Sequence, residues 1–204
     1  DHTLIAPYIS LYWGSLMIGR WTGAITVFKP QGAKKTALQI FVPLFAFLIV
    51  YLVNQLIGHD TSDFIFYLPF VCVAIALFII SGEDAAKTLM LLAGAATVLM
   101  LVGLFSNGTL ALLAFTSGGL FCSVMWPCIF SLSIGRLGKY TNQGSSLLIM
   151  MILGGGLVPL FQGFLADKIG IHESYFITVI CFAYLAWLGY KMRKAPVSTD
   201  SVAH

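Results

Sequence analysis

The chain has 204 residues, of which 59% are hydrophobic and 9% are charged. Soluble domains carry about 25% charged residues, so this chain has too few polar groups to cover its apolar surface in water. Its formal net charge of +3 comes from basic residues scattered over short loops, a pattern that does not indicate nucleic-acid binding. We therefore predict an all-α polytopic membrane protein whose apolar surface is covered by the lipid bilayer.

Seven apolar segments follow one another along the chain. An apolar run of about 20 residues is long enough to cross a bilayer as a helix. Arg20 is the only charged residue inside any of these runs, as expected because a charge at the bilayer centre costs roughly 3 kcal/mol. The predicted spans are 4–28, 37–58, 64–80, 88–105, 109–134, 145–166 and 174–190.

The basic residues of the loops favour one orientation. If consecutive helices alternate in direction, nine lysines and arginines fall at one end and Lys168 alone falls at the other. Because basic loops stay in the cytoplasm, we expect the amino end outside and the carboxyl end inside a bacterial inner membrane. We expect residues 1–194 to form the transmembrane bundle and residues 195–204 to form a polar cytoplasmic tail. The nine residues are Lys29, Lys34, Lys35, Lys87, Arg136, Lys139, Lys191, Arg193 and Lys194.

The first span carries aromatic and small residues at helical spacing. Tyr12 and Trp13 lie deeper than the aromatic belt of a membrane interface, so they are candidate ligand contacts as well as candidate packing residues. Arg20 lies between Gly19 and Gly23. Its side chain can extend to the interface or clamp a neighbouring helix during a conformational cycle, and the flanking glycines indicate tight packing.

Trp126 and Pro127 lie in the middle of the fifth span. Proline removes a backbone donor and bends a helix, and such a bend is tolerated where neighbouring helices or a wet cavity satisfy the backbone. In a continuous helix, Gly118, Gly119 and Cys122 would share a stripe with Trp126. The indole offers a flat apolar face and one donor to a cavity. It can equally pack at the kink, and the sequence leaves both interpretations open.

A triple glycine marks the sixth span, which is joined to the fifth by a polar loop. Gly154, Gly155 and Gly156 precede Pro159. Small residues let helices approach closely, and transporters break helices at their binding sites, so the two roles are compatible. Gln162 is the only amide of this span, and it either faces a cavity or bonds to a neighbouring helix.

No set of residues typical of an enzyme or a cofactor site occurs. The spans contain no central Asp or Glu, and we find no acid–base pair, phosphate loop or metal-binding motif. The four cysteines lie in apolar runs without CxxC spacing, which favours free thiols packed in helices. We therefore expect a protein that is not an enzyme and holds no cofactor or metal. The chain opens at Asp1 without an initiator methionine or a signal peptide, so we expect a piece of a longer protein.

Two ordered blocks of residues resemble a known family. The first comprises Pro127, Ile129, Phe130, Ser131, Leu132, Ile134, Leu137, Gly138, Thr141, Gly144, Ser145, Ser146, Met150, Ile152, Gly154, Gly155, Gly156, Pro159, Gly163 and Asp167. The second comprises Tyr8, Ile18, Gly19, Arg20, Thr22 and Gly23. Together they resemble the fucose permease branch of the major facilitator superfamily, which includes the bacterial glucose/galactose permeases. The likeness is good over residues 4–28 and from residue 88 onward.

The resemblance implies twelve helices in two six-helix bundles around a central sugar cavity. Residues 4–28 would be the eighth helix and residues 88–190 the ninth to twelfth, with an extra helix pair at 37–80 inserted between them. The amino-terminal half, which carries the proton-linked carboxylates of this family, would be missing from this chain. The resemblance also implies that the spans 4–28, 109–134 and 145–166 contact sugar and that Trp126 matches a cavity aromatic.

We therefore expect the carboxyl-terminal part of an inner-membrane monosaccharide transporter that works by alternating access, with proton symport as its expected coupling. A carrier of another small solute and a transporter-like receptor on the same fold stay open as alternatives, as do sodium coupling and uniport. The sequence does not distinguish among the hexoses. The expected substrate contacts are Tyr12, Trp13, Trp126 and Gln162. The residues expected to serve packing or conformational change are Gly19, Arg20, Gly23, Pro127, Gly154, Gly155, Gly156 and Pro159.

Overall fold

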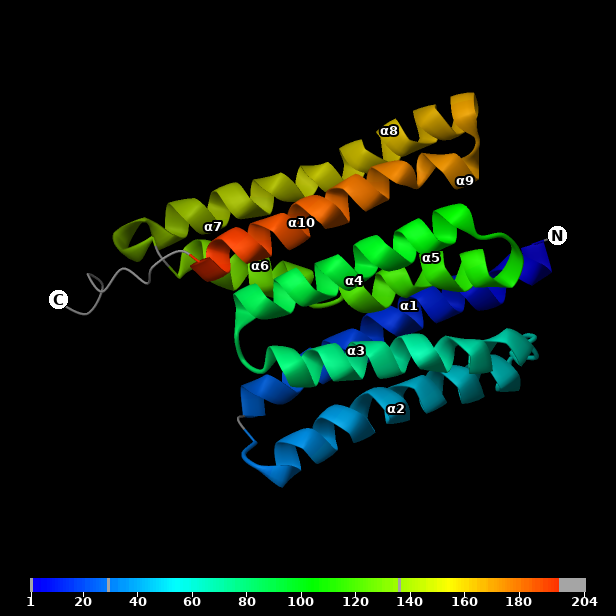
Figure 1. Cartoon of the computed structure of the whole chain (residues 1–204), viewed down its shortest axis with the longest axis horizontal. Helices are drawn as coiled ribbons and strands as arrows, with labels where there is room; N and C mark the ends of the chain where they lie inside the picture. Colours follow the sequence, from blue (N-terminus) through cyan, green and yellow to red (C-terminus); the bar gives the residue numbers. More distant parts are fainter. Residues whose placement is uncertain (1, 29, 136, 195–204) are drawn as a thin grey trace.

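The computed structural model describes residues 2–28, 30–135 and 137–194, and all regular structure in these ranges is helical (Figure 1). Short 3-10 segments at Ile25–Phe28, Ser62–Tyr67 and Gly138–Tyr140 extend α1, α3 and α7, and Met151–Leu153 joins α7 to α8. The helices are α1 (His2–Ala24), α2 (Ala33–Leu56), α3 (Leu68–Ser81), α4 (Ala85–Phe105), α5 (Gly108–Cys122), α6 (Met125–Ile134), α7 (Thr141–Met150), α8 (Gly154–Ile169), α9 (Ile171–Ser174) and α10 (Phe176–Lys194).

Six helical stretches of the described chain, some of them interrupted, are long and apolar enough to cross a membrane. Helix α1 has 23 residues and packs among them as a seventh, although it is richer in polar groups. The chain is therefore an all-α polytopic membrane protein, and the predicted fold class is confirmed. The six stretches are Ala33–Leu56, Ser62–Ser81, Ala85–Phe105, Gly108–Ile134, Gly138–Ile169 and Ile171–Lys194.

Helix α4 lies at the centre of the bundle. It packs along α10 and α5, while α1 packs between α5 and α2. The pair α2–α3 and the helix α10 thus lie on opposite sides of α1, α4 and α5 (Figure 1). Most of the largest fully buried side chains come from α1, α4, α5 and the 3-10 segment before α3, and they include Leu11, Ile18, Phe64, Tyr67, Leu89, Leu92 and Phe121.

The turn between α3 and α4 illustrates how the sequence sets a helix end. Gly82 has a φ of 67°, a conformation that favours glycine because it has no Cβ atom. The Asp84 carboxylate then accepts hydrogen bonds from the backbone N–H groups of Ala86 and Lys87, at 2.9 and 3.1 Å. This N-cap satisfies donors that the first turn of α4 leaves free, and the short turn makes α3 and α4 antiparallel neighbours.

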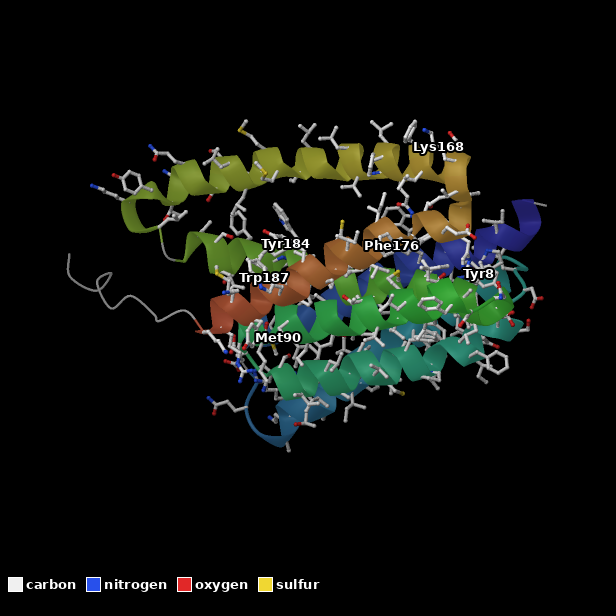
Figure 2. The ribbon with its side chains drawn as sticks, turned by 45° about the horizontal axis from the view of Figure 1, so that its top comes forward. Tyr8, Met90, Lys168, Phe176, Tyr184 and Trp187 are labelled. Atoms are coloured by element: carbon white, nitrogen blue, oxygen red, sulfur yellow. The ribbon has the colours of Figure 1, made fainter. Side chains whose placement is uncertain are left out.

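Basic residues gather at one end of the bundle, as predicted. Lys34 and Lys35 lie at the start of α2, Lys87 at the start of α4, Lys139 just before α7, and Lys191, Arg193 and Lys194 at the end of α10. Lys35 Nζ also forms an ion pair with Glu83 Oε1 at 2.7 Å. Lys168 lies at the opposite end, the same end of the bundle as Tyr8 (Figure 2). Lys29, Arg136 and the predicted tail 195–204 lie outside the described residues.

Residues 138–169 form a long rod at the edge of the bundle (Figure 1). None of the residues of this rod is buried. It contacts α6 near one end and α9 at the other, and the described part of the chain leaves the length between them largely uncovered. The helix inside it begins at Thr141 rather than at the predicted Ser145, because the 3-10 turn Gly138–Tyr140 leads directly into it.

The fifth span breaks earlier than the position of its proline suggests. Helix α5 ends at Cys122 and α6 begins at Met125. Pro127 has no backbone N–H, so the carbonyl of Ser123, four residues earlier, loses its helical partner. The predicted continuous stripe from Gly118 to Trp126 is therefore wrong.

Close contact between α4 and α10 depends on Gly189. A Cβ atom at this position would lie 2.6 Å from the backbone nitrogen of Met90 and 3.0 Å from the carbonyl oxygen of Ala86. These are backbone atoms of α4, which cannot move aside as a flexible side chain can. Gly189 therefore sets the distance between the two most extensively packed helices of the bundle.

We expect Gly189→Ala to destabilise the protein by about 1–3 kcal/mol, because overpacking forces the backbones of α4 and α10 apart. Thermal unfolding in detergent measures the effect. Gly94→Ala in α4 is the matched control, since a Cβ atom there meets no atom within 4 Å. Equal melting temperatures for the two variants would contradict the prediction.

Candidate functional site

A cavity of about 760 Å³ lies between α1, α5, α8, α9 and α10. Its volume falls within the range of ligand pockets, about 300–1,000 Å³. We call it the outer cavity, because it lies toward the end that the basic loops predict to be outside. Its polar lining comprises Tyr8, Tyr12, Asn107, Thr116, Gln162, His172 and Thr178, together with the hydroxyl of Tyr175.

Tyr12 forms the α1 wall of the outer cavity. A Cβ atom at Gly119 would lie 2.8 Å from the carbonyl oxygen of Tyr12 and 2.9 Å from its ring carbon Cδ2, so the missing side chain of Gly119 permits this contact. The rings of Tyr12 and Trp13 meet edge-on, with centroids 5.7 Å apart. Trp13 is 65% exposed and does not line the outer cavity.

Gln162 lines the outer cavity from α8, on the rod. Its side chain is half-buried, and no described residue forms a hydrogen bond with its amide. A free amide offers two donors and one acceptor group to a ligand. On α5, by contrast, the Thr116 hydroxyl donates to the carbonyl of Leu112 at 2.7 Å, so Thr116 offers a ligand only an acceptor. The predicted contacts Tyr12 and Gln162 therefore share one cavity.

His172 of α9 holds the end of the outer cavity in place. Its Nε2 donates to the carbonyl oxygen of Leu104, the penultimate residue of α4, at 2.9 Å. Its ring meets that of Phe115 edge-on at 5.4 Å, and Phe115 stacks on Tyr175 with centroids 4.1 Å apart. These contacts join the corner between α8 and α10 to α4 and α5.

A second cavity of about 700 Å³, the inner cavity, lies between α1, α3, α4 and α6. It shares no lining residue with the outer cavity. Trp126 and Pro127 line it from α6, and Arg20 lines it from α1. The structure thus does not bring Trp126 together with Tyr12 and Gln162, although the sequence grouped them as substrate contacts.

The break between α5 and α6 packs tightly on α1. A Cβ atom at Gly19 would lie 2.8 Å from the carbonyl oxygen of Leu120, and one at Gly23 would lie 2.6 Å from Val124 Cγ1. Both glycines therefore permit close helix contact. Cys122 lines the outer cavity and Ser123 the inner one, so this packed break separates the two.

The triple glycine of the rod has different surroundings. Cβ atoms built at Gly154, Gly155 and Gly156 meet no atom within 4 Å, so close packing within the described chain does not explain these residues. They follow the 3-10 turn Met151–Leu153 directly, and Pro159 lies inside α8. A change of helix type, three glycines and a proline in succession favour bending at this point.

The outer cavity can hold a neutral polar ligand. The described lining residues combine aromatic rings with hydroxyl, amide and imidazole groups, and none of them is a carboxylate, lysine or arginine. Within the described ranges, no three His, Cys, Asp or Glu side chains come close enough to hold a metal ion. Thr116, His172 and Thr178 were not predicted from the sequence, because only the folded chain shows that α9 turns back onto α5.

The chain is similar in sequence to several bacterial transport proteins. A glucose/galactose transporter of Brucella abortus is 43% identical over 106 residues, which is 52% of this chain and 26% of that protein. The L-fucose-proton symporter of Escherichia coli is 36% identical over 147 residues, covering 69% of this chain and 34% of its own. A Helicobacter pylori protein, provisionally named a glucose/galactose transporter, is 34% identical over 202 residues, covering 95% and 37%.

The chain is a relative of bacterial sugar transporters. This confirms the resemblance to the fucose and glucose/galactose permeases that the two blocks of residues indicate. The chain spans 26–37% of the length of these three sugar transporters. No family model and no solved structure matches it.

Proposed function

We propose that this chain forms a substrate-binding part of a monosaccharide transporter in the bacterial inner membrane. The main support for this proposal is the outer cavity, which Tyr12 lines from α1 and Gln162 from α8. The chain that forms this cavity is related to sugar transporters. A hexose is neutral and carries hydroxyl groups that pair with an amide and apolar faces that pack on aromatic rings. The lining of the outer cavity offers both.

The proposed mechanism is alternating access, in which two helical bundles rock around a site near mid-membrane. The rest of the transporter supplies the second bundle and covers the exposed rod. The packed break at Cys122–Val124 closes the pathway to one side of the membrane while the pathway to the other side is open. The rod bends at its glycines during this change. The basic ends of the helices face the cytoplasm, and the pair α2–α3 is an addition to the bundle.

Proton symport is the coupling that we propose, because one of the three similar proteins is named an L-fucose-proton symporter. The described residues that line the outer cavity include no Asp or Glu. We propose that another part of the transporter supplies the group that carries the proton. Uptake that leaves the internal pH unchanged would contradict this coupling.

Counterflow of labelled sugars tests the function. The full-length protein is reconstituted in vesicles preloaded with unlabelled glucose, galactose or fucose, and labelled sugar is added outside. We expect accumulation of at least one of the three. If none of the monosaccharides accumulated, the result would favour a carrier of another solute or a receptor on the same fold. Binding without counterflow would favour the receptor.

Two native thiols can report alternating access. Cys122 lines the outer cavity and Cys128 the inner one, while Cys72 and Cys181 lie exposed on the helix surfaces and line neither cavity. With Cys72 and Cys181 replaced by serine, we expect a charged methanethiosulfonate added outside to modify Cys122 and one added inside to modify Cys128. Saturating sugar should change the two rates in opposite directions. Parallel changes would contradict alternating access.

A substitution at Trp126 tests whether this residue contacts the ligand or only packs at the helix break. We expect Trp126→Ala to weaken sugar binding from the cytoplasmic side by about tenfold, because the inner cavity loses its indole face. Trp13→Ala, which removes an indole that lines neither cavity, is the control. Binding in inside-out vesicles measures both. Equal affinities for Trp126→Ala and the wild type would assign Trp126 to packing at the helix break.

A further inference from the structure

The pair α2–α3 is held to α1 by specific contacts rather than by apolar packing alone. A Cβ atom at Gly14 of α1 would lie 2.7 Å from Val50 of α2, so the two helices meet closely. Tyr67, in the 3-10 segment before α3, is fully buried, and its ring stacks with those of Phe47 and Phe70 at 6.4 and 5.5 Å. This cluster fixes the Tyr67 ring and directs its hydroxyl toward α1.

The Tyr67 hydroxyl pairs with Ser15 inside the bundle. The two oxygens lie 2.8 Å apart, and Ser15 Oγ lies 2.6 Å from the carbonyl oxygen of Leu11. Because a carbonyl only accepts, the single Ser15 proton goes to Leu11 and Tyr67 donates to Ser15. Ser15 is fully buried, and an unpaired hydroxyl there would be costly.

A second hydrogen bond joins the same elements at the mouth of the outer cavity. Tyr8 lines this cavity, and its hydroxyl donates to Asp63 Oδ2 at 2.5 Å. Asp63 precedes Tyr67 by one helical turn, and Tyr8 precedes Ser15 by two. Both bonds therefore connect one side of α1 to one short segment, Ser62–Tyr67.

The segment of α1 between these bonds carries the cavity wall. Tyr12 lies between Tyr8 and Ser15, and it contacts Gly119 on the opposite element, α5. Gly19, one turn beyond Ser15, contacts the break after α5. Helix α1 is thus held between α5 and the pair over the stretch that lines the outer cavity.

We propose that Asp63 and Tyr67 are positioning residues for the outer cavity. They touch no ligand themselves. They hold α1 by Tyr8 and Ser15, and so fix the wall that Tyr8 and Tyr12 present to the substrate. The pair α2–α3 thereby determines affinity from outside the cavity. The inference rests on the proposed sugar-binding role of this cavity.

Paired substitutions in the full-length protein test the inference. We expect Asp63→Asn and Tyr67→Phe each to raise the KM for the transported sugar by about tenfold, because the first leaves the Tyr8 hydroxyl only an uncharged, weaker acceptor and the second removes a buried hydrogen bond. The kcat should stay unchanged, since neither residue lies at the helix break. Tyr8→Phe should raise the KM at least as much as Asp63→Asn, and the double variant Tyr8→Phe/Asp63→Asn should show no larger effect than Tyr8→Phe alone.

The chain offers matched controls for both substitutions. Asp60 is three residues from Asp63, and the backbone N–H of Ser62 lowers the pKa of its carboxyl. Asp60→Asn keeps that acceptor and should leave KM unchanged. Tyr51→Phe removes a tyrosine hydroxyl of α2 that accepts from Gln55 and not from α1. An unchanged KM in Asp63→Asn and Tyr67→Phe, or an equal rise in the controls, would overturn the inference.

A readout without sugar separates this inference from the proposed function. Cys122 lines the outer cavity, so a loosened α1 wall should raise its rate of modification by an externally added methanethiosulfonate. We expect a rise of about tenfold in the two variants, the factor expected for loss or weakening of one such hydrogen bond. If the wild type transports no sugar but this rate rises, the proposed function fails and the positioning role stands. If sugar is transported and neither KM nor the rate changes, only the positioning role fails.

Discussion

Replacing Gln162 with leucine should weaken sugar binding by ten- to a hundredfold, about 1.4–2.8 kcal/mol. The amide lines the outer cavity and bonds to no described residue, so its donors are free for ligand hydroxyls. Leucine is similar in size to glutamine and is favourable in a membrane helix, so the fold should persist. Equilibrium binding of labelled sugar to the purified full-length protein measures the loss.

Gln143→Leu is the control for this substitution. Gln143 lies on the same rod, in α7, and is exposed outside both cavities. It should bind sugar like the wild type. If the two variants bound equally well, Gln162 would have no part in the site. If both lost binding, the cause would be the rod as a whole rather than one amide.

Converting Gly154, Gly155 and Gly156 together to alanine should abolish most transport while sparing sugar binding. Each Cβ atom enters open space, so no clash is expected. Each alanine favours the helix by about 0.5–1 kcal/mol over glycine, and three together should stiffen the rod where it bends. Initial uptake rates and equilibrium binding, measured on the same preparation, separate the two effects.

Gly94→Ala again serves as the comparison. It also places a methyl group in open space on a transmembrane helix, but α4 is the packed centre of the bundle and is not expected to bend. Uptake by this variant should equal that of the wild type. Normal uptake by the triple variant would show that the glycines serve contact with another part of the transporter and not flexing.

The helices and their order were predictable because hydrophobic length decides them. Each of the seven apolar runs corresponds to one continuous or broken helical stretch. The position of the break in the fifth span was not predicted, although the same chemistry explains it. Pro127 is the cause, but its effect falls on the carbonyl of Ser123, one helical turn earlier.

The composition of the outer cavity was only partly predictable. Tyr12 and Gln162 stand out in a sequence because they are polar or amphipathic within apolar runs. Trp13 has the same appearance, yet its place on the helix turns it outward. The role of His172 depends on its contact with Leu104, which is 68 residues away. Such long-range contacts leave no local signal in one sequence.

The contact between His172 and Leu104 gives the rod a fulcrum. The rod is fixed to the bundle at its α9 end, and 32 residues of helix extend from there over roughly 48 Å. Between this corner and the bend at the glycines, α8 has 16 residues and is about 24 Å long. A tilt of about 10° around the corner would displace the Gly154 end of α8 by roughly 4 Å. Gln162 lies only seven residues from the corner, so a small movement of this side chain onto a ligand is amplified about twofold at the bend.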